Sequence, residues 1–289
     1  MHTILKSAKQ EITVGIDRPF VMIGEKINPT GSKKLAAALR DGNLDFVRQL
    51  AARQVAWGAE VLDVNVGLPD FDEVLAITQV VKAVAEAVAV PLCLDSANPK
   101  VLAAGLAAAP GKPLINSVSG EEKRLASILP LAKERGAAVI GLTIGDGGIP
   151  KTAEERLAVA EKILERAAKA GLPAEDVIID PLVMTVGSDS KAALVTLQTI
   201  ALLRERFGVN INLGASNVSF GLPDRLTVNQ SFLAMAIQAG ATCSITDPVK
   251  LGMIIRASDL LVGRDDFAMK FIKYYRNSET LRAQEQSAA

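Results

Sequence analysis

Residues 91–117 read PLCLDSANPKVLAAGLAAAPGKPLINS, and their pattern indicates the fold class. It opens with a short apolar run that ends in Asp95, continues through an alanine-rich segment suited to a helix, and closes with a second apolar run that ends in Asn116. Two strands joined by a helix of this length are expected to lie parallel, because a parallel pair needs a long crossover connection. The stretch therefore predicts an α/β fold.

The same unit repeats along the chain. We expect eight strands, at about Phe20–Glu25, Glu60–Asn65, Pro91–Asp95, Pro113–Ser117, Ala138–Thr143, Val177–Asp180, Asn210–Ser216 and Ala241–Thr246. Helical segments separate them, at about Leu44–Trp57, Asp72–Ala89, Lys100–Ala108, Glu121–Arg135, Ala153–Lys169, Lys191–Arg206 and Arg225–Ala239, with two more at Val249–Leu261 and Asp265–Arg276. Eight such units favour a closed (β/α)8 TIM barrel over an open sheet. The turn after the first strand reads NPTGSKK, which is not the G-x-G-x-x-G turn of dinucleotide-binding folds.

The barrel is expected to form a single domain over residues 20–276. Residues 1–19 are predicted to be an N-terminal extension, with a hairpin over EITVGIDRPF (residues 11–20) that covers the lower end of the barrel. The polar residues 277–289 are expected to form a frayed tail.

Composition excludes several classes of function. Lys and Arg together number 32, as do Asp and Glu, so net charge gives no reason to expect binding to nucleic acid or to a membrane surface. No apolar run is long enough to cross a membrane, and we expect a cytoplasmic protein. The two cysteines, Cys93 and Cys243, lie in apolar runs and are predicted to be buried thiols. His2 is the only histidine, which argues against a His/Cys metal site and a Ser-His-Asp triad.

Short polar residues mark the ends of the predicted strands, where a barrel of this type builds its active site. The candidate site residues are Glu25, Asn28, Asp63, Asn65, Asp95, Asn116, Asp180, Ser216 and Asn217. Each has a structural alternative, because Asp, Asn and Ser also cap helices. So many in one layer favour recognition of a flat heterocycle, since a carboxylate accepts two adjacent N–H groups and an amide both donates and accepts.

Two lysines, Lys33 and Lys34, follow the first predicted strand. They have two possible roles: steering an anionic substrate tail, or forming the solvated start of a helix.

Seven motifs at the predicted strand ends resemble, in this order, those of the pterin-binding methyltransferases. They are IGEKINPTGSKK, LDVNVG, LCLDS, INSVS, IGLT, IIDPL and GASNVSFG. This family includes methyltetrahydrofolate:corrinoid protein methyltransferases and the folate domain of cobalamin-dependent methionine synthase. The resemblance covers roughly residues 20–260. Dihydropteroate synthase is a more distant relative, because its S-T-R-P-G loop after the second strand is replaced here by GLPDFD (residues 67–72).

The resemblance implies a TIM barrel that binds N5-methyltetrahydrofolate in its mouth. It implies reversible methyl exchange with cob(I)alamin carried on a separate corrinoid protein, without a metal of its own, and a homodimer. Asp95, Asn116 and Asp180 would bind the pterin edge, and Asn217 would be the catalytic residue near N5. Asp63 and Asn65 would complete the polar wall, with contributions from Glu25, Asn28, Ser216 and Arg225. The alternatives are a dihydropteroate synthase-like enzyme and a pterin-binding protein without catalytic activity.

The chemistry fits such a residue set. Cobalt(I) is the nucleophile, so the enzyme has to position the substrates and stabilise positive charge at N5 as the methyl group departs. The carbonyl oxygen of Asn217 would accept a hydrogen bond from protonated N5. Corrinoid-binding domains of the usual kind supply a histidine from an Asp-x-His motif, which this sequence lacks.

Overall fold

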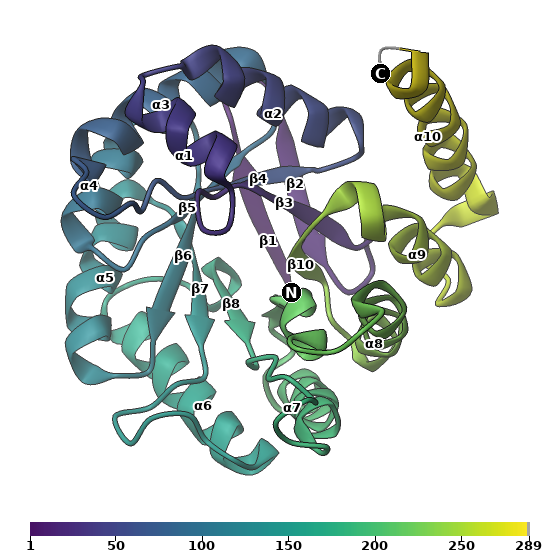
Figure 1. The fold of residues 1–289 in the computed structure, drawn as a ribbon. Coiled ribbons are helices and arrows are strands. Elements are labelled where there is room, and N and C mark those ends of the chain that lie inside the picture. The colour runs from purple at the N-terminus through teal and green to yellow at the C-terminus, as the bar shows by residue number, and fades with distance from the viewer. Residues whose placement is uncertain (288–289) are drawn as a thin grey trace.

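The core of the computed structural model, which describes residues 1–287, is an eight-stranded parallel sheet in the order β10-β3-β4-β5-β6-β7-β8-β9 (Figure 1). The strands are β3 (Val21–Ile27), β4 (Val61–Val64), β5 (Leu92–Asp95), β6 (Leu114–Ser119), β7 (Ala138–Leu142), β8 (Val177–Asp180), β9 (Asn210–Ile211) and β10 (Cys243–Thr246). Backbone hydrogen bonds of 3.0 Å from Thr242 to Ile211 and from Ile245 to Leu213 join the two outermost strands. The sheet thus closes, which confirms the predicted TIM barrel.

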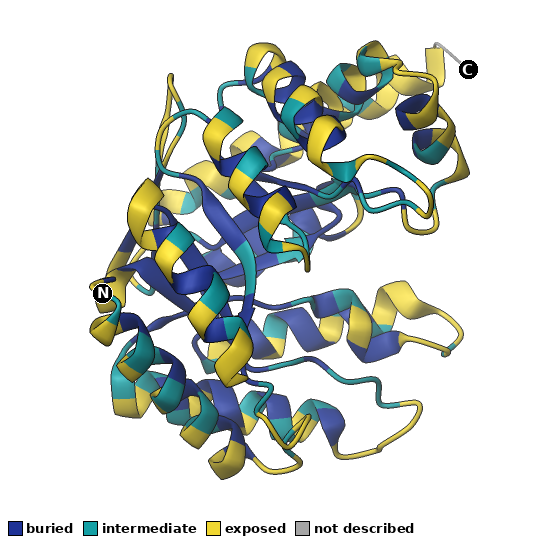
Figure 2. Cartoon of the chain, turned by 90° about the vertical axis from the view of Figure 1, so that its left-hand side faces the viewer, coloured by how far each residue is buried: buried dark blue, intermediate teal, exposed yellow. Residues whose placement is uncertain are grey.

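Helices surround the sheet and pack their apolar faces on it, so that Figure 2 shows buried strands inside helices striped with exposed residues. They are α1 (Lys33–Arg40), α2 (Leu44–Ala56), α3 (Glu73–Ala87), α4 (Pro99–Ala108), α5 (Glu122–Arg135), α6 (Ala153–Lys169), α7 (Ala192–Phe207), α8 (Arg225–Ala239), α9 (Pro248–Leu261) and α10 (Met269–Ser287). Three short 3₁₀ segments are η1 (Ala174–Asp176), η2 (Ala215–Ser219) and η3 (Asp266–Ala268). Within residues 1–287, no helix is long and apolar enough to span a membrane.

The lower end of the barrel is filled by an antiparallel hairpin of β1 (His2–Lys6) and β2 (Glu11–Gly15). Leu5 and Val14 are fully buried and join the apolar cluster inside the barrel. The amide of Asn210 donates to the Thr3 hydroxyl (2.9 Å) and to the Val14 carbonyl (3.0 Å), which fixes the hairpin to β9. The N-terminal segment does form a hairpin, but its strands are residues 2–6 and 11–15, and not the two halves of residues 11–20.

Helix α9 ties the end of the barrel to its beginning. The Asp259 carboxylate accepts the Phe20 backbone N–H (2.9 Å), while Arg256 donates to the Phe20 carbonyl (2.9 Å). Arg256 also pairs with Asp259 (3.2 Å) and Glu60 (2.9 Å). This buried cluster holds α9 against the residue that precedes β3.

Three segments differ from the expectations. Residues 277–287, expected to fray, belong to α10. Glu285 on this helix pairs with Arg53 of α2 (2.8 Å) and accepts a hydrogen bond from the indole of Trp57 (3.2 Å), which follows α2. The last two residues of the predicted tail, 288–289, lie outside the described residues. The predicted strand over residues 210–216 ends at Ile211, and residues 215–219 form η2. Lys33 and Lys34 begin a short helix, α1, for which no separate range was predicted, although an exposed helix start was one of their two expected roles and is confirmed.

Candidate active site

Alternation along the strands decides which polar groups enter the mouth, because successive side chains point to opposite faces. Ile23, Val61, Cys93, Leu114 and Ile178 belong to the apolar cluster inside the barrel. The next inward position on each of these strands is two residues later. Those positions are occupied by Glu25, Asp63, Asp95, Asn116 and Asp180. The predicted polar ring thus lies one layer above the barrel core.

Asp63 and Asn116 form the middle of this layer. The Asn116 amide donates a hydrogen bond of 3.1 Å to Asp63, whose side chain is 98% shielded from solvent. Burial, reinforced by the nearby charge of Asp95, raises the pKa of Asp63 to about 8, although the Asn116 hydrogen bond opposes the shift. Asp63 therefore holds its proton more strongly than an ordinary carboxyl group, and the protonated acid can donate a hydrogen bond as well as accept one.

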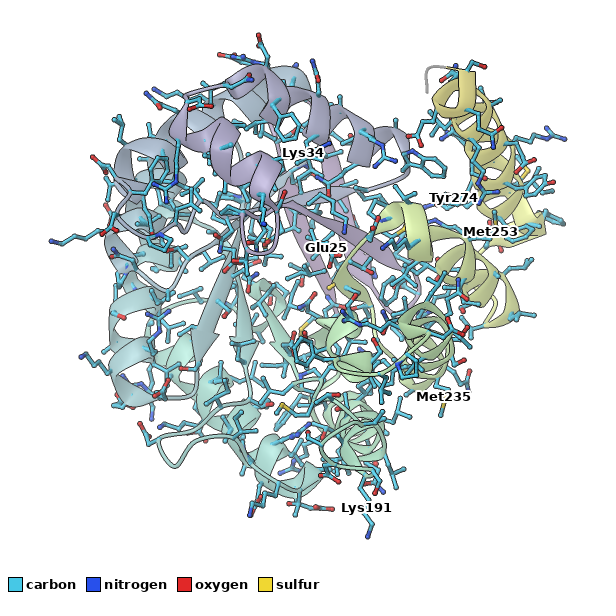
Figure 3. All side chains as sticks on the ribbon, viewed as in Figure 1. Glu25, Lys34, Lys191, Met235, Met253 and Tyr274 are labelled. Carbon is cyan, nitrogen blue, oxygen red and sulfur yellow. The ribbon has the colours of Figure 1, made fainter. Side chains whose placement is uncertain are left out.

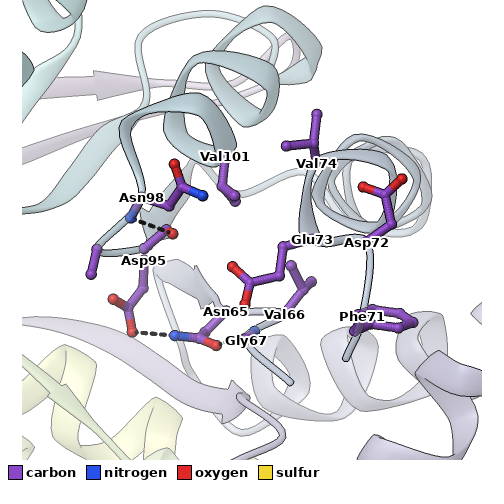
Figure 4. A pocket seen from close by; sticks show the side chains of 12 residues that line it. Asn65, Val66, Gly67, Phe71, Asp72, Glu73, Val74, Asp95, Asn98 and Val101 are labelled. Carbon is purple, nitrogen blue, oxygen red and sulfur yellow. Dashed lines mark hydrogen bonds between the residues drawn. The ribbon is translucent and has the colours of Figure 1, made fainter. Parts of the chain in front are cut away.

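Asp95 lies on β5, the strand next to β4, two residues beyond the Cys93 that pairs with Asp63. Its charge is near enough to act on Asp63. The Asn65 amide donates to Asp95 (3.0 Å), and the Asn65 oxygen accepts the Gly67 backbone N–H (2.7 Å), so Asn65 is fixed at both ends. Burial raises the pKa of Asp95, and the hydrogen bond from Asn65 opposes this shift. Figure 4 shows this pair at the base of a cavity of about 700 Å³ between the starts of α3 and α4.

An opening at the mouth, which we call the main cavity, has a volume of about 820 Å³. Its lining includes Glu25, Lys26, Asn28, Lys33, Lys34, Phe46, Leu50, Asp63, Asp95, Asn116 and Ile245. Figure 3 shows Glu25 near the centre of the barrel opening and Lys34 on the helix at its edge. Five of the predicted site residues therefore meet in one cavity: Glu25, Asn28, Asp63, Asp95 and Asn116.

An ionic cluster separates the main cavity from a smaller one. The Lys26 ammonium lies 3.1 Å from Glu25 and 2.9 Å from Asp247. Burial disfavours the charged form of Lys26, but these two carboxylates outweigh it, and the pKa of Lys26 is raised. Glu25 and Lys26 also line the smaller cavity, of about 270 Å³, together with Ser216 and Arg225. Glu25 is therefore shared by two openings.

Asp180 is a second buried acid of this layer. It is 6% exposed and does not line the three cavities described above. One of its oxygens accepts the Leu182 N–H (2.9 Å) and the other accepts the Asn212 amide (2.8 Å). Burial raises the pKa of Asp180 to about 6, against the opposing effects of these two donors and of Arg156. Leu182 has a φ of 64°, a left-handed conformation unusual for leucine.

The segment after β9 carries the remaining candidates. Arg225 donates to the Ser216 carbonyl (2.8 Å) and the Ser219 hydroxyl (3.0 Å), so it holds η2 in place. Asn217 lies on η2 with an exposed side chain that makes no hydrogen bond within residues 1–287, and it lines none of the three cavities. Gly214 lies close by, since a β-carbon there would come within 3.1 Å of the Asn217 amide nitrogen.

Asn212 is a site residue that sequence reasoning missed. The predicted seventh strand ends at residue 216, with Ser216 and Asn217 as its polar end. Asn210 points into the barrel, where it contacts the hairpin, so the alternation indicates Asn212 as the next inward residue. Lys26, Phe46 and Leu50 were also missed: Lys26 follows Glu25 directly in sequence, and the other two come from α2.

The arrangement suits a neutral or weakly polar heterocycle with both donors and acceptors on its edge. Asp63, Asp95 and Asn116 offer carboxylates and an amide, one of the acids carrying a proton at neutral pH. Within residues 1–287, no three His, Cys, Asp or Glu side chains are grouped so as to hold a metal ion. Cys93 and Cys243 are buried free thiols, as predicted.

Comparison with known proteins shows which family has this sequence and fold. Residues 24–247 match the family described as pterin binding enzyme. Methylcorrinoid:tetrahydrofolate methyltransferase of Eubacterium limosum is 32% identical over 268 residues, which cover 90% of this chain and 97% of the relative. Methionine synthase of Mycobacterium tuberculosis is 31% identical over 81% of this chain, which corresponds to 21% of that protein.

Among solved structures, a Yersinia pestis dihydropteroate synthase with a pterine–sulfa conjugate superposes with a TM-score of 0.69. It is 18% identical and the match covers 91% of this chain and 100% of that one. A Xanthomonas albilineans dihydropteroate synthase with 4-aminobenzoic acid gives a TM-score of 0.67 at 19% identity, over 91% and 98% of the two chains. At this level of identity the likeness concerns the fold. With the match over residues 24–247 and the full-length relative, the chain belongs to the pterin-binding enzyme family.

Proposed function

We propose that this enzyme transfers a methyl group between N5-methyltetrahydrofolate and the cobalt of a corrinoid carried on a separate protein. The observation that carries the proposal is the relative named methylcorrinoid:tetrahydrofolate methyltransferase, which this chain matches at 32% identity over nearly the whole length of both. The polar floor of the main cavity supports it, since it combines acids and amides that can hold a heterocycle, and a cobalt nucleophile makes a protein nucleophile unnecessary.

The floor would hold the pterin. Asp95 accepts N–H groups of the amino-pyrimidinone edge, while Asn116 and protonated Asp63 supply a donor for its carbonyl or ring nitrogen. Asp180 adds an acceptor from β8, oriented by Asn212 and the Leu182 N–H. Such fixed partners position N5 without reorganisation during the reaction, which is the main contribution an enzyme makes to this transfer.

Asn217 is the proposed catalytic residue. Its amide is free to reach a ligand, because it makes no hydrogen bond to residues 1–287 and lies on η2 at the mouth. Its carbonyl oxygen accepts a hydrogen bond from protonated N5 and so favours the protonated amine. The positive charge of N5 is lost as the bond from N5 to the methyl group breaks, the methyl group bonds to cobalt(I) and the proton stays on N5. Removing one such contact costs about 10²- to 10³-fold in rate in comparable sites.

In this proposal a partner protein carries the corrinoid and docks at the mouth. The sole histidine, His2, is paired with Asp17 at 2.6 Å on the hairpin that fills the opposite end of the barrel. It is therefore far from any position at which it could ligate cobalt above the main cavity.

The test combines the purified protein, methyltetrahydrofolate and chemically reduced cob(I)alamin. We expect loss of the cob(I)alamin absorbance with formation of methylcobalamin. Asn217→Ala should lower this rate about 10²- to 10³-fold and leave the Kd for folate nearly unchanged. The matched control is Gln238→Ala, which removes an exposed amide on α8 and should have no effect.

Two outcomes would contradict the proposal. A protein that binds folate and never methylates any reduced corrinoid is a pterin-binding protein without this activity. A protein that instead condenses a dihydropterin pyrophosphate with p-aminobenzoate is a dihydropteroate synthase-like enzyme.

We also propose a homodimer, as the resemblance to the methyltransferases implies. Sedimentation velocity over a range of concentrations tests this directly. A species of the monomer mass of 30.4 kDa at all concentrations would disprove it.

A further inference from the structure

The main cavity has three chemical zones. Buried Asp63 and half-buried Asp95 and Asn116 form a polar floor. Phe46 and Leu50, both half-buried on α2, supply an apolar wall. The third zone is the exposed edge of the cavity, which carries two cations described next. Such a cavity suits a ligand with a polar head, an apolar middle and an anionic end.

Lys33 and Lys34 form the exposed edge. Both line the main cavity, and neither lies within ion-pair distance of a carboxylate among residues 1–287. The third lysine of the cavity, Lys26, is already neutralised by Glu25 and Asp247. The uncompensated positive charge of the cavity therefore comes from Lys33 and Lys34.

Local helix stability does not account for these lysines. They occupy the first turn of α1, where Ser32 is the N-cap and no acidic residue is present. Cations at a helix N-terminus are disfavoured by the helix dipole, so both positions carry a small energetic penalty in the absence of a ligand. An anion bound between the lysines and the cavity would turn this energetic penalty into a favourable interaction.

We propose that Lys33 and Lys34 bind the carboxylates of the glutamate tail of folate, and that the enzyme prefers poly-γ-glutamylated folates over the monoglutamate. The inference rests on the proposed function, because it assumes that the pterin occupies the floor. The benzoyl ring then packs on Phe46 and Leu50, and the glutamates reach the exposed edge. Each added glutamate brings one more carboxylate to the two lysines.

The expected preference is modest, because the lysines are exposed and their charge is screened by salt. Two exposed ion pairs, one between each lysine and a glutamate carboxylate, give about a 3- to 10-fold difference in Kd between triglutamate and monoglutamate. The preference should shrink as the ionic strength rises, whereas binding of the pterin head should not.

The test measures Kd by isothermal titration calorimetry for tetrahydrofolate, its triglutamate, and a tetrahydropterin without a tail. The wild-type protein is compared with Lys33→Ala/Lys34→Ala, with Lys33→Glu, and with Lys191→Ala. Lys191 is an exposed lysine that precedes α7 and does not line the main cavity, so it is the matched control. We expect the double variant to lose the triglutamate preference, Lys33→Glu to disfavour the triglutamate, and Lys191→Ala to behave as wild type.

Equal affinity of the wild type for both folates would overturn the inference, as would a preference that survives in the double variant. In either case binding of the tail-less pterin and methyl transfer from the monoglutamate would persist, so the proposed function would stand. Conversely, a triglutamate preference without methyl transfer to any corrinoid would uphold the tail site and reject the proposed function.

Discussion

The side-chain amide of Asn212 donates a hydrogen bond of 2.8 Å to the carboxylate of Asp180. Both groups are buried, and Asn212 is 1% exposed. The amide orients the one acid of the mouth that comes from β8, and it also lowers the pKa of Asp180 relative to burial alone.

Replacing Asn212 by alanine should therefore affect both stability and ligand binding. The Asp180 oxygen loses its donor in a buried place, so we expect about 1–3 kcal/mol of destabilisation in urea unfolding. We also expect weaker tetrahydrofolate binding, because Asp180 is no longer oriented. Asn277→Ala is the control: it removes a 2.7 Å bond to the Ala56 carbonyl in an exposed place and should leave folate binding intact. Unchanged folate affinity in Asn212→Ala would refute the role given to Asp180.

The pH dependence of stability should report the buried acid Asp63. Its folded-state pKa of about 8 lies above the usual value of 3.8, so between these values the folded state holds a proton that the unfolded state has lost. Its contribution to stability is thus complete below about pH 4 and is lost as the pH rises toward and through 8.

We expect Asp63→Asn to flatten the fall in unfolding free energy between pH 5 and 9, as measured by denaturant titration at several pH values. The contrasting control is Asp146→Asn. Its pKa is lowered by the hydrogen bond from Lys162, so any contribution it makes is present at neutral pH and lost in acid. An unchanged alkaline slope in Asp63→Asn would show that Asp63 is ionised in the folded protein.

Gly214 should be sensitive to an added methyl group because of its neighbour Asn217. A β-carbon at residue 214 would lie 3.1 Å from the Asn217 amide nitrogen, so the side chain has to shift by a few tenths of an ångström. Under the proposed function, Gly214→Ala lowers methyl transfer about 3- to 10-fold, less than Asn217→Ala does, because small misplacements reduce rate steeply.

Folate affinity should be unaffected by Gly214→Ala. Gly147→Ala is the control, since a β-carbon there meets no atom within 4 Å. Full activity in Gly214→Ala would indicate that the exact placement of Asn217 does not matter.

The buried pair of Asp259 and Arg256 should be important for stability, because it ties α9 to Phe20. Asp259→Ala removes the acceptor of the Phe20 N–H and one partner of a buried guanidinium. We expect about 3 kcal/mol of destabilisation in urea unfolding. Glu279→Ala, which breaks an exposed pair with Arg282, should change stability by less than about 1 kcal/mol. A similar small effect for Asp259→Ala would show that packing alone holds α9.

The barrel and most of its polar layer could be predicted because strand alternation and strand–helix repetition are local in sequence. Glu25, Asp63, Asp95 and Asn116 follow from this regularity. Asn212 was missed because β9 keeps only two residues in regular pairing, so its end was placed too late. Phe46 and Leu50 come from a helix whose approach to the mouth depends on tertiary packing. The helical state of residues 277–287 depends on contacts between Glu285 and residues of α2 that are more than 200 positions away.

The hairpin that fills the lower end of the barrel has a kinetic consequence. With Leu5 and Val14 buried there, the hairpin fills the lower end of the barrel, and the main cavity opens toward the mouth. Under the proposed function, folate and the corrinoid protein therefore share one entrance. A corrinoid protein that docks first blocks that entrance, so the two substrates should bind in a compulsory order, with folate entering first and leaving last. Excess corrinoid protein should then act as a dead-end inhibitor that competes with folate.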